Sequence, residues 1–358
     1  MLSINDFAVV DLFCGIGGLT HGLTKNGFDV AAGIDFDQSC KYSFEKNNNS
    51  KFIYKDIVNL EMKELKGLFP EGKRQILVGC APCQPFSIYN HKNNNNKEEQ
   101  SKDEKWKLLY SFGRLIEETQ PEIVSMENVP LLKSFNNGQV FNDFVSNLER
   151  NGYLVSHKIV NAQDYGVPQR RKRLILLASK HGEIELIKPT HNTSNYNTVR
   201  KAIGHLEPIN GGDISKIDRL HYARKLSELN EKRIKATKEG GSWKDWDESL
   251  LLECHKKIGG KSFGSVYGRM KWDDVSPTMT TYCIGLGNGR FGHPQQNRAI
   301  SLREAAIFQS FPENYEFINP DVPFSSAKIA RHIGNAVPVG LGEAIAESIK
   351  IHIQNLDE

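Results

Sequence analysis

The chain has 358 residues with 46 Lys and Arg against 43 Asp and Glu, so its formal net charge is only +3. Hydrophobic residues make up 39%, which excludes an intrinsically disordered chain and supplies enough apolar material for a packed core. Six Cys are too few for a disulfide framework, no apolar run approaches the roughly 20 residues that span a bilayer, and the N-terminus does not resemble a signal peptide. We expect a cytosolic protein of two domains, or of one large domain with an insertion.

Short apolar strands alternate with helical segments through the first half of the chain. Strands are predicted at residues 7–13, 30–34, 52–54, 75–78, 123–126, 154–160 and 174–178. Strands separated by helices, such as the one predicted at 20–26, indicate an α/β fold with a doubly wound, mostly parallel sheet. Ligands bind such sheets beyond the carboxyl ends of the strands.

From about residue 180 this alternation stops. The following residues are rich in polar side chains and Gly, and a single helix-like charged stretch spans 214–238. Helices are predicted again at 302–308, 326–333 and 340–353. We therefore predict two domains. The first covers 1–179 and is completed by 322–358, and a smaller, irregular one covers 180–321.

Positive charge gathers in one part of the chain. Residues 216–271 hold 14 Lys and Arg but 8 Asp and Glu, a local net charge of +6. Trp, Tyr and Gly are interleaved with these basic residues, which favours a nucleic-acid surface over a merely solvated face. The aromatic residues are Trp243, Trp246, Tyr267 and Trp272, and the candidates for base contact are Arg219, Arg224, Arg233, Arg269 and Lys271.

The sequence DLFCGIGG at 11–18 predicts a strand, a glycine loop and the start of a helix. Thr20 stands where the dinucleotide fingerprint needs Gly, and the GK[ST] of a P-loop is absent, so the loop indicates another nucleoside-type cofactor. Asp35 follows about twenty residues after the glycines, at the spacing that suits a ribose hydroxyl pair. Asp56, after the third strand, suits an exocyclic amine.

The sequence Cys80-Ala81-Pro82-Cys83 allows two interpretations. A C-x-x-C with this Pro resembles a thioredoxin-type redox motif, but Pro85 predicts a loop where such a motif opens a helix. A zinc site is excluded, because the other Cys form no second C-x-x-C and no His pair, and we expect no metal. A single nucleophilic thiolate remains, suited to attack on an electron-poor carbon.

Polar residues also follow the later strands. Glu127, in Met-Glu-Asn-Val-Pro, ends a predicted strand, where a partly buried carboxyl group can donate a proton or a hydrogen bond. Gln169, Arg171 and Arg173 alternate along a predicted strand edge. Arg side chains at this spacing point the same way and suit a phosphate or a base carbonyl.

Together and in this order, these blocks resemble the DNA (cytosine-5)-methyltransferases, notably the bacterial ones that accompany restriction endonucleases. The resemblance covers residues 7 to about 180 and about 272 to 342, including Ser-Pro-Thr at 276–278 and Gly-Asn-Ala-Val-Pro at 334–338. It implies a Rossmann-like fold and S-adenosylmethionine (SAM) as the methyl donor. The residues it assigns to SAM are Asp11, Phe13, Gly15, Gly17, Gly18, Asp35, Phe36, Asp56, Ile57, Pro82, Leu108 and Asn335.

The resemblance also implies the chemistry. Cys83 would add to C6 of a cytosine that is flipped out of the duplex, and Glu127 would assist at N3 and the exocyclic amine. Arg173, with Arg171, would hold the carbonyl oxygen of the base and a nearby phosphate. Cys80 stands where the family usually has a small residue, so it receives no role beyond packing.

Residues 180–275 would then read base edges of double-stranded DNA in the major groove. The DNA contacts expected on these grounds are Ser87, Gln169, Arg269 and Thr280. A cognate restriction endonuclease would be a functional partner, and the protein would act as a monomer in the cytoplasm of a bacterium or archaeon.

Two alternatives stay open. One is an RNA cytosine-5 methyltransferase of the same fold, against which the basic, Gly- and Trp-rich segment favours DNA. The other is a sequence-specific DNA-binding repressor that has lost catalysis, against which the intact Cys83, Glu127 and Arg173 argue.

Overall fold

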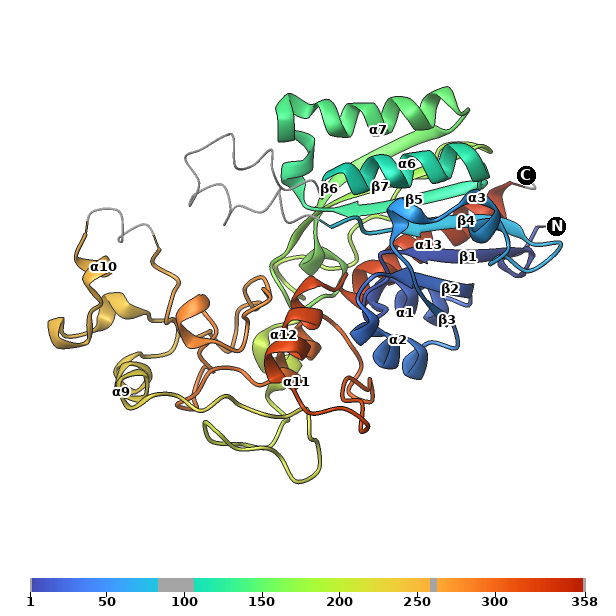
Figure 1. Cartoon of the computed structure of the whole chain (residues 1–358). Coiled ribbons are helices and arrows are strands. Elements are labelled where there is room, and N and C mark those ends of the chain that lie inside the picture. The colour runs from blue at the N-terminus through green and yellow to red at the C-terminus, as the bar shows by residue number, and fades with distance from the viewer. Residues whose placement is uncertain (1, 83–105, 258–262, 357–358) are drawn as a thin grey trace. The chain divides into compact units, whose positions relative to one another are not determined.

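The computed structural model describes residues 2–82, 106–257 and 263–356 (Figure 1). These form two compact units. Unit 1 comprises Met1–Asn161, Lys172–Pro189 and Val337–Glu358, and unit 2 comprises Ala162–Arg171 and Thr190–Ala336. The boundaries differ from those predicted, because residues 162–171 and 322–336 belong to unit 2 and 180–189 to unit 1.

Unit 1 is built on a seven-stranded sheet in the order β3-β2-β1-β4-β5-β7-β6. The strands are β1 (Phe7–Leu12), β2 (Asp29–Asp35), β3 (Lys51–Tyr54), β4 (Arg74–Gly79), β5 (Ile123–Asn128), β6 (Leu154–Asn161) and β7 (Lys172–Ser179). Pairing is parallel from β3 to β5, and β7 is antiparallel to β5 and β6. Every residue of β1 is buried, as expected of a central parallel strand covered on both faces. The predicted doubly wound, mostly parallel α/β fold is confirmed.

Helices cover both faces of this sheet. They are α1 (Gly18–Lys25), α2 (Lys41–Asn47), α3 (Met62–Lys66), α6 (Lys107–Thr119), α7 (Gln139–Arg150) and α13 (Val339–Asn355). Figure 1 shows α6 and α7 on one face and α1, α2 and α13 on the other. Helices α1 and α13 approach closely because Gly22 lacks a Cβ, which would lie 2.5 Å from the carbonyl carbon of Gly342. None of the described helices is long and apolar enough to cross a membrane.

Unit 2 contains little regular structure. Its helices are α8 (Val199–Ile203), α9 (Glu228–Ala236), α10 (Glu253–Lys256), α11 (Leu302–Phe308) and α12 (Ser326–Asn335). The helix predicted over 214–238 is wrong for most of its length, because only α9 is helical and Ile214 forms an isolated bridge with Tyr222. The side chain of Ser227 accepts a hydrogen bond from the main chain of Asn230 and so fixes where α9 begins.

Buried arginines organise the irregular loops of unit 2. Such loops leave main-chain carbonyls without a ladder partner, and a guanidinium group offers five donors to pair with them. Arg269, only 4% exposed, donates to the main-chain oxygens of Ile234, Thr237, His293 and Gln296. Arg298 is fully buried and donates to both carboxylate oxygens of Glu304, at 2.8 and 2.7 Å.

Candidate active site

Three polar side chains meet where β4 and β5 end and β7 begins. Glu127, the next-to-last residue of β5, is only 2% exposed. The Nε atom of Arg173 lies 2.7 Å from Oε1 of Glu127, and the Sγ atom of Cys80 donates to Oε2 at 2.7 Å. The structure thus brings Glu127 and Arg173 together and adds Cys80 to them.

Strand register explains why these residues are neighbours. β4 and β5 are parallel with Gly79 beside Met126, so Cys80 and Glu127 are the next pair along. β5 and β7 are antiparallel with Glu127 opposite Ile175, which makes Arg173 a diagonal neighbour of Glu127 on the same face of the sheet. The positions follow from the order and direction of the strands.

The carboxylate of Glu127 is charge-compensated but incompletely hydrogen-bonded. Oε1 is buried and accepts no hydrogen bond from the described residues, although the Arg173 guanidinium is close enough for an ion pair. A buried carboxylate is costly without such a partner. The remaining acceptor capacity can receive an N–H group of a ligand, and the same carboxyl group can carry a proton to a ring nitrogen.

Hydrogen bonds fix the backbone beside Glu127. The main-chain N–H of Cys80 donates to the carbonyl of Leu12 at 3.3 Å, and Nδ2 of Asn128 donates to the carbonyl of Ala81 at 3.1 Å. Pro82, half-buried, is the last described residue of this segment. Cys83 and Ser87, the predicted nucleophile and a predicted DNA contact, lie outside the described residues.

The glycine loop between β1 and α1 is held by Asp35. Gly15 and Gly17 have φ of 52° and 87°, and Phe13 shares this left-handed conformation with φ of 60°. Oδ2 of Asp35 accepts the N–H of Gly15 at 2.9 Å, which ties the loop to the end of β2. A Cβ at Gly15 would meet no described atom within 4 Å, so the loop leaves room for a ligand.

Asp11 presents a buried acceptor beside this loop. Its Oδ2 accepts a hydrogen bond from Oγ1 of Thr20 at 2.7 Å, whereas its buried Oδ1 has no hydrogen-bond partner among the described residues. Burial raises the pKa of Asp11 to about 7, against the opposing effect of the Thr20 hydrogen bond. Burial also raises the pKa of Asp35. A ligand that donates hydrogen bonds or carries positive charge suits both carboxyl groups.

The other residues assigned to the cofactor differ in exposure. Phe36, directly after β2, is 61% exposed and offers a ring face for stacking. Asp56 is exposed, and its Oδ1 accepts the N–H of Val58 at 3.0 Å. Ile57 is 2% exposed and packs in the core, and Leu108 in α6 is half-buried.

The side chains of two predicted contacts form hydrogen bonds inside unit 2. The buried Nε2 of Gln169 donates to the carbonyl of Phe308 and to Gln309, and its Oε1 accepts the N–H of Met279. Arg171, 4% exposed, donates to the carbonyls of residues 279, 334 and 336. The DNA contact of Gln169 and the base contact of Arg171 stay predictions. The alternation fails because β7 begins only at Lys172.

The guanidinium of Arg269 likewise donates to the loop carbonyls described above, and its DNA contact stays a prediction. Thr280 is half-buried and accepts the N–H of Tyr282 at 3.4 Å, and Asn335 is exposed at the end of α12. A Cβ at Gly334 would collide with the main chain of Thr280, so Gly is required for this contact.

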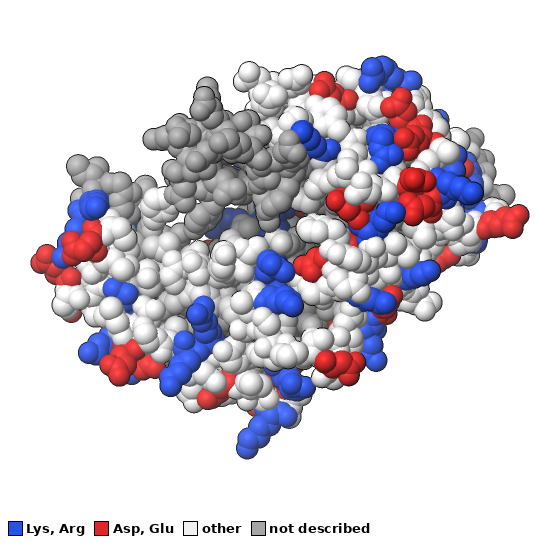
Figure 2. Space-filling view, viewed as in Figure 1, with Lys and Arg blue, Asp and Glu red and all other residues white. Residues whose placement is uncertain are grey.

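Three of the four aromatic residues expected on a nucleic-acid surface, Trp243, Trp246 and Tyr267, pack together with His255 instead. Trp243 and Trp246 are 6% and 8% exposed, and the ring of Trp243 stacks on His255 at 4.2 Å. Arg233, also buried, lies over the rings of Trp246 and Tyr267. The exposed members of the predicted basic set are Arg219, Arg224 and Lys271. Figure 2 shows Lys and Arg interspersed with some Asp and Glu on the visible face around α9.

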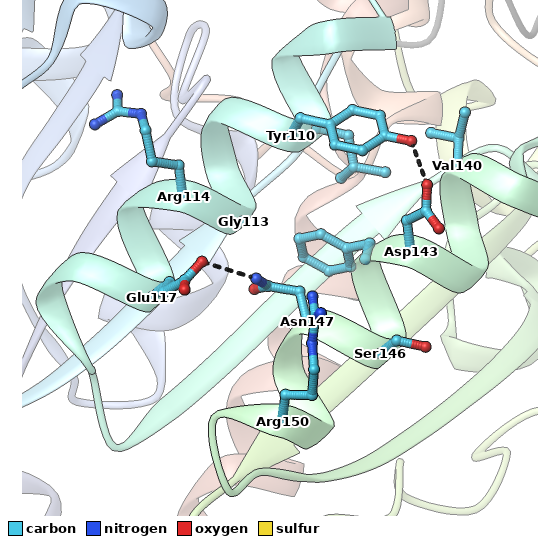
Figure 3. Close-up of a pocket in the computed structure, with 11 residues that line it drawn as sticks. Tyr110, Gly113, Arg114, Glu117, Val140, Asp143, Ser146, Asn147 and Arg150 are labelled. Atoms are coloured by element: carbon cyan, nitrogen blue, oxygen red, sulfur yellow. Dashed lines mark hydrogen bonds between the residues drawn. The ribbon is translucent and has the colours of Figure 1, made fainter.

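A pocket of about 370 Å³ lies between α6 and α7 and contains none of the predicted site residues (Figure 3). Its floor is apolar, with Leu109, Val140 and Phe144. Tyr110 donates to Asp143 at 2.6 Å across its rim, and burial followed by this carboxylate raises the pKa of Tyr110 to about 12. These contacts hold the two helices together and bring no group of the site into the pocket.

Sequence reasoning missed two features. Cys80 was given no chemistry, although its distance of one residue from the end of β4 could have indicated a neighbour of Glu127. The buried pair of Arg298 and Glu304 was also missed. The Ser-x-x-Glu sequence at 301–304 could have indicated this pair, because it forms a capping box at the start of α11.

Comparison with known proteins gives the family. The chain matches the model of the C-5 cytosine-specific DNA methylases over residues 7–351. Type II methylase M.HgiDII of Herpetosiphon aurantiacus is 53% identical over 98% of this chain and 97% of that protein. Type II methyltransferase M1.HphI of Haemophilus parahaemolyticus is 31% identical over 95% of this chain and 86% of that protein.

A solved structure shows the same fold. It is that of a protein assigned as a DNA modification methyltransferase and encoded within a prophage (E. coli), and it matches with a TM-score of 0.73 at 22% identity, covering 98% of this chain and 99% of that one. The family match spans both units, and the relatives match over nearly their whole lengths. The chain therefore belongs to the C-5 cytosine-specific DNA methylases and is a DNA (cytosine-5)-methyltransferase.

Proposed function

We propose that the protein transfers a methyl group from SAM to C5 of a cytosine flipped out of a specific short duplex sequence, and so protects that DNA from a cognate restriction endonuclease. The observation that carries this proposal is the buried Glu127, paired with Arg173 and left with acceptor capacity on Oε1. The 53% identity to a Type II methylase supports the place in a restriction-modification system.

The groups around the glycine loop fit SAM. Asp11 offers a buried acceptor that suits the ammonium group of a methionine moiety, and Asp35 suits a ribose hydroxyl pair. The exposed ring of Phe36 suits an adenine face. The contributions of Leu108, Pro82 and Asn335 stay predictions. When bound, SAM supplies the electrophilic methyl group that C5 takes up.

The protein's own residues prepare the base and restore it. The thiolate of Cys83 forms a bond to C6, the C5–C6 electron pair moves toward C5, and Glu127 supplies a proton or hydrogen bond at N3. Arg173 keeps the carboxyl group of Glu127 in place and faces the base carbonyl. After methylation a base removes the C5 proton, the electron pair restores the C5–C6 double bond, and the Cys83 thiolate leaves. Flipping is required because C6 is inaccessible in a stacked duplex.

Unit 2 supplies the DNA-recognition surface in this proposal. The exposed Arg219, Arg224 and Lys271 suit phosphate contacts, which position a duplex without reading its sequence. Thr280, on a loop pinned by Arg171 and Gln169, stays a proposed backbone contact. In this proposal the protein acts as a monomer.

The test is transfer of radiolabelled methyl groups from SAM to duplex DNA and to tRNA, followed by bisulfite sequencing of DNA from cells that express the chain. We expect label in DNA and 5-methylcytosine at one short sequence. Label confined to tRNA would favour the RNA methyltransferase alternative. A Cys83→Ala variant is expected to lose transfer yet bind DNA, and full activity in that variant would refute the covalent mechanism.

A further inference from the structure

We propose that the thiol of Cys80 is a positioning residue that fixes the carboxylate of Glu127 for the methyl-transfer reaction. The proposal rests on the role assigned to Glu127 above. Its basis is the hydrogen bond from Sγ of Cys80 to Oε2 of Glu127, at 2.7 Å, in a chain whose sequence suggested only a packing role for this Cys.

Cys80 and Arg173 hold the two oxygens of one carboxylate from opposite neighbouring strands. Arg173 approaches Oε1 from β7, and Cys80 approaches Oε2 from the end of β4. Rotation of the carboxylate about its terminal bond would break at least one of these contacts. The pair of contacts therefore selects one orientation before a base arrives, which is how supporting groups preorganise a catalytic side chain.

The protonation of this pair follows from its geometry. A thiolate at 2.7 Å from a carboxylate would place two negative charges in contact inside a low-dielectric site. One proton must therefore lie between sulfur and oxygen. That proton is donated by Sγ of Cys80 to Oε2 of Glu127, which leaves Oε1, beside Arg173, as the oxygen available to the base.

The thiol itself is held in place by its backbone. The N–H of Cys80 donates to the carbonyl of Leu12, and Asn128, the residue after Glu127, donates to the carbonyl of Ala81, the residue after Cys80. These two bonds link the ends of β1, β4 and β5. The backbone at Cys80 is therefore fixed, which places its S–H group within reach of Glu127.

The experiment compares Cys80→Ala, Cys80→Ser and the matched control Cys254→Ala, in which an exposed thiol in unit 2 is removed. For Cys80→Ala we expect kcat for duplex DNA to fall roughly 3- to 10-fold, the scale of one lost hydrogen bond, with KM values for DNA and SAM nearly unchanged. Cys80→Ser keeps a donor and should recover most of kcat, and Cys254→Ala should match the wild type. Thermal unfolding checks that all variants fold.

A double-mutant cycle separates positioning from packing. In a Glu127→Gln background, Cys80→Ala should lower single-turnover transfer by less than twofold, because the group that Cys80 positions is already impaired. An equal loss in both backgrounds, or no recovery in Cys80→Ser, would overturn the proposal. Failure of the proposed function is a separate outcome, seen as absence of methyl transfer to DNA by the wild-type enzyme.

Discussion

Both units bury a pair of Arg and Glu side chains, but they complete its hydrogen bonds to different extents. In unit 2, Arg298 donates to both oxygens of Glu304, and the N–H of Ser301 donates to Oε2 at 2.7 Å. In unit 1, Arg173 approaches Glu127 through Nε, and Oε1 accepts no hydrogen bond from the described residues. Both oxygens of Glu304 are therefore hydrogen-bonded within the protein, whereas Oε1 of Glu127 has no hydrogen-bond partner among the described residues.

This difference fits a structural role for Glu304 and the catalytic role that we propose for Glu127. Burial alone would raise the pKa of Glu304, but the hydrogen bonds and charge of Arg298 lower it to about 2. Such a group stays ionised and exchanges no proton near neutral pH. Glu127, for which we propose a proton or hydrogen bond to the base, has no hydrogen-bond partner at Oε1 among the described residues.

The strongest test of this difference is to remove the negative charge of Glu127 in unit 1. Glu127→Gln keeps the shape of the side chain but removes the proton-carrying group, so we expect kcat to fall about 10²- to 10⁴-fold. DNA binding, measured by fluorescence anisotropy, should change little. Transfer of labelled methyl groups to duplex DNA gives kcat, and a loss of less than fivefold would contradict the role of Glu127.

The same substitution in unit 2 should affect folding instead. Glu304→Gln leaves the fully buried Arg298 without its counter-charge, which typically costs about 3–5 kcal/mol. Urea unfolding followed by Trp fluorescence measures this, because Trp243, Trp246 and Trp272 report on unit 2. An unfolding free energy within about 1 kcal/mol of the wild type would show that this pair is dispensable.

The buried His293 of unit 2 should make the stability of the protein depend on pH. Burial lowers the pKa of His293 from 6.5 to about 4, and its Nδ1 accepts the N–H groups of Gln295 and Gln296, which requires that nitrogen to be unprotonated. Between pH 6.5 and 4 the unfolded chain binds the proton more readily, so the stabilising contribution is complete above 6.5 and is lost as the pH falls. Over this range the contribution of His293 to the free energy of unfolding falls by roughly 3 kcal/mol.

Unfolding free energies at pH 7 and pH 5 measure this effect in the wild type and in His293→Asn. The variant should lose less stability on acidification than the wild type does. Glu304 titrates in a lower window, between its ordinary value of 4.5 and about 2, so it leaves this measurement unaffected. Equal acid sensitivity of the two proteins would rule out His293 as the responsible group.

The sheet of unit 1 could be predicted because most of its strands are short apolar runs separated by helical segments, and each predicted strand coincides with an observed one. The same reasoning placed Glu127 at a strand end. It failed at Gln169 and Arg171, because alternation along a strand holds only while the chain stays in the sheet, and residues 162–171 belong to unit 2. The partners of these side chains are distant in sequence, so local patterns cannot find them.

Counting charged residues along the sequence overestimated the exposed basic surface for a related reason. The local net charge of +6 over 216–271 includes Arg233 and Arg269, which are buried against aromatic rings and main-chain carbonyls. In a region with little regular structure, loop carbonyls need donors, and Arg supplies them. Composition does not separate such arginines from those that face solvent, so the surface is less basic than the sequence indicated.

The smallest predicted effect tests which of these cations reach DNA. Lys271 is exposed and only two residues from the buried Arg269, so Lys271→Ala should weaken duplex binding a few-fold and reduce the salt dependence of affinity by about one phosphate contact. The control is Lys66→Ala, an exposed Lys of α3 in unit 1, which should leave that dependence unchanged. Binding isotherms over a range of salt concentrations provide the slopes. If both variants keep the wild-type slope, Lys271 does not contact phosphate, and the recognition surface must be sought around Arg219 and Arg224, which the same measurement can then test in turn.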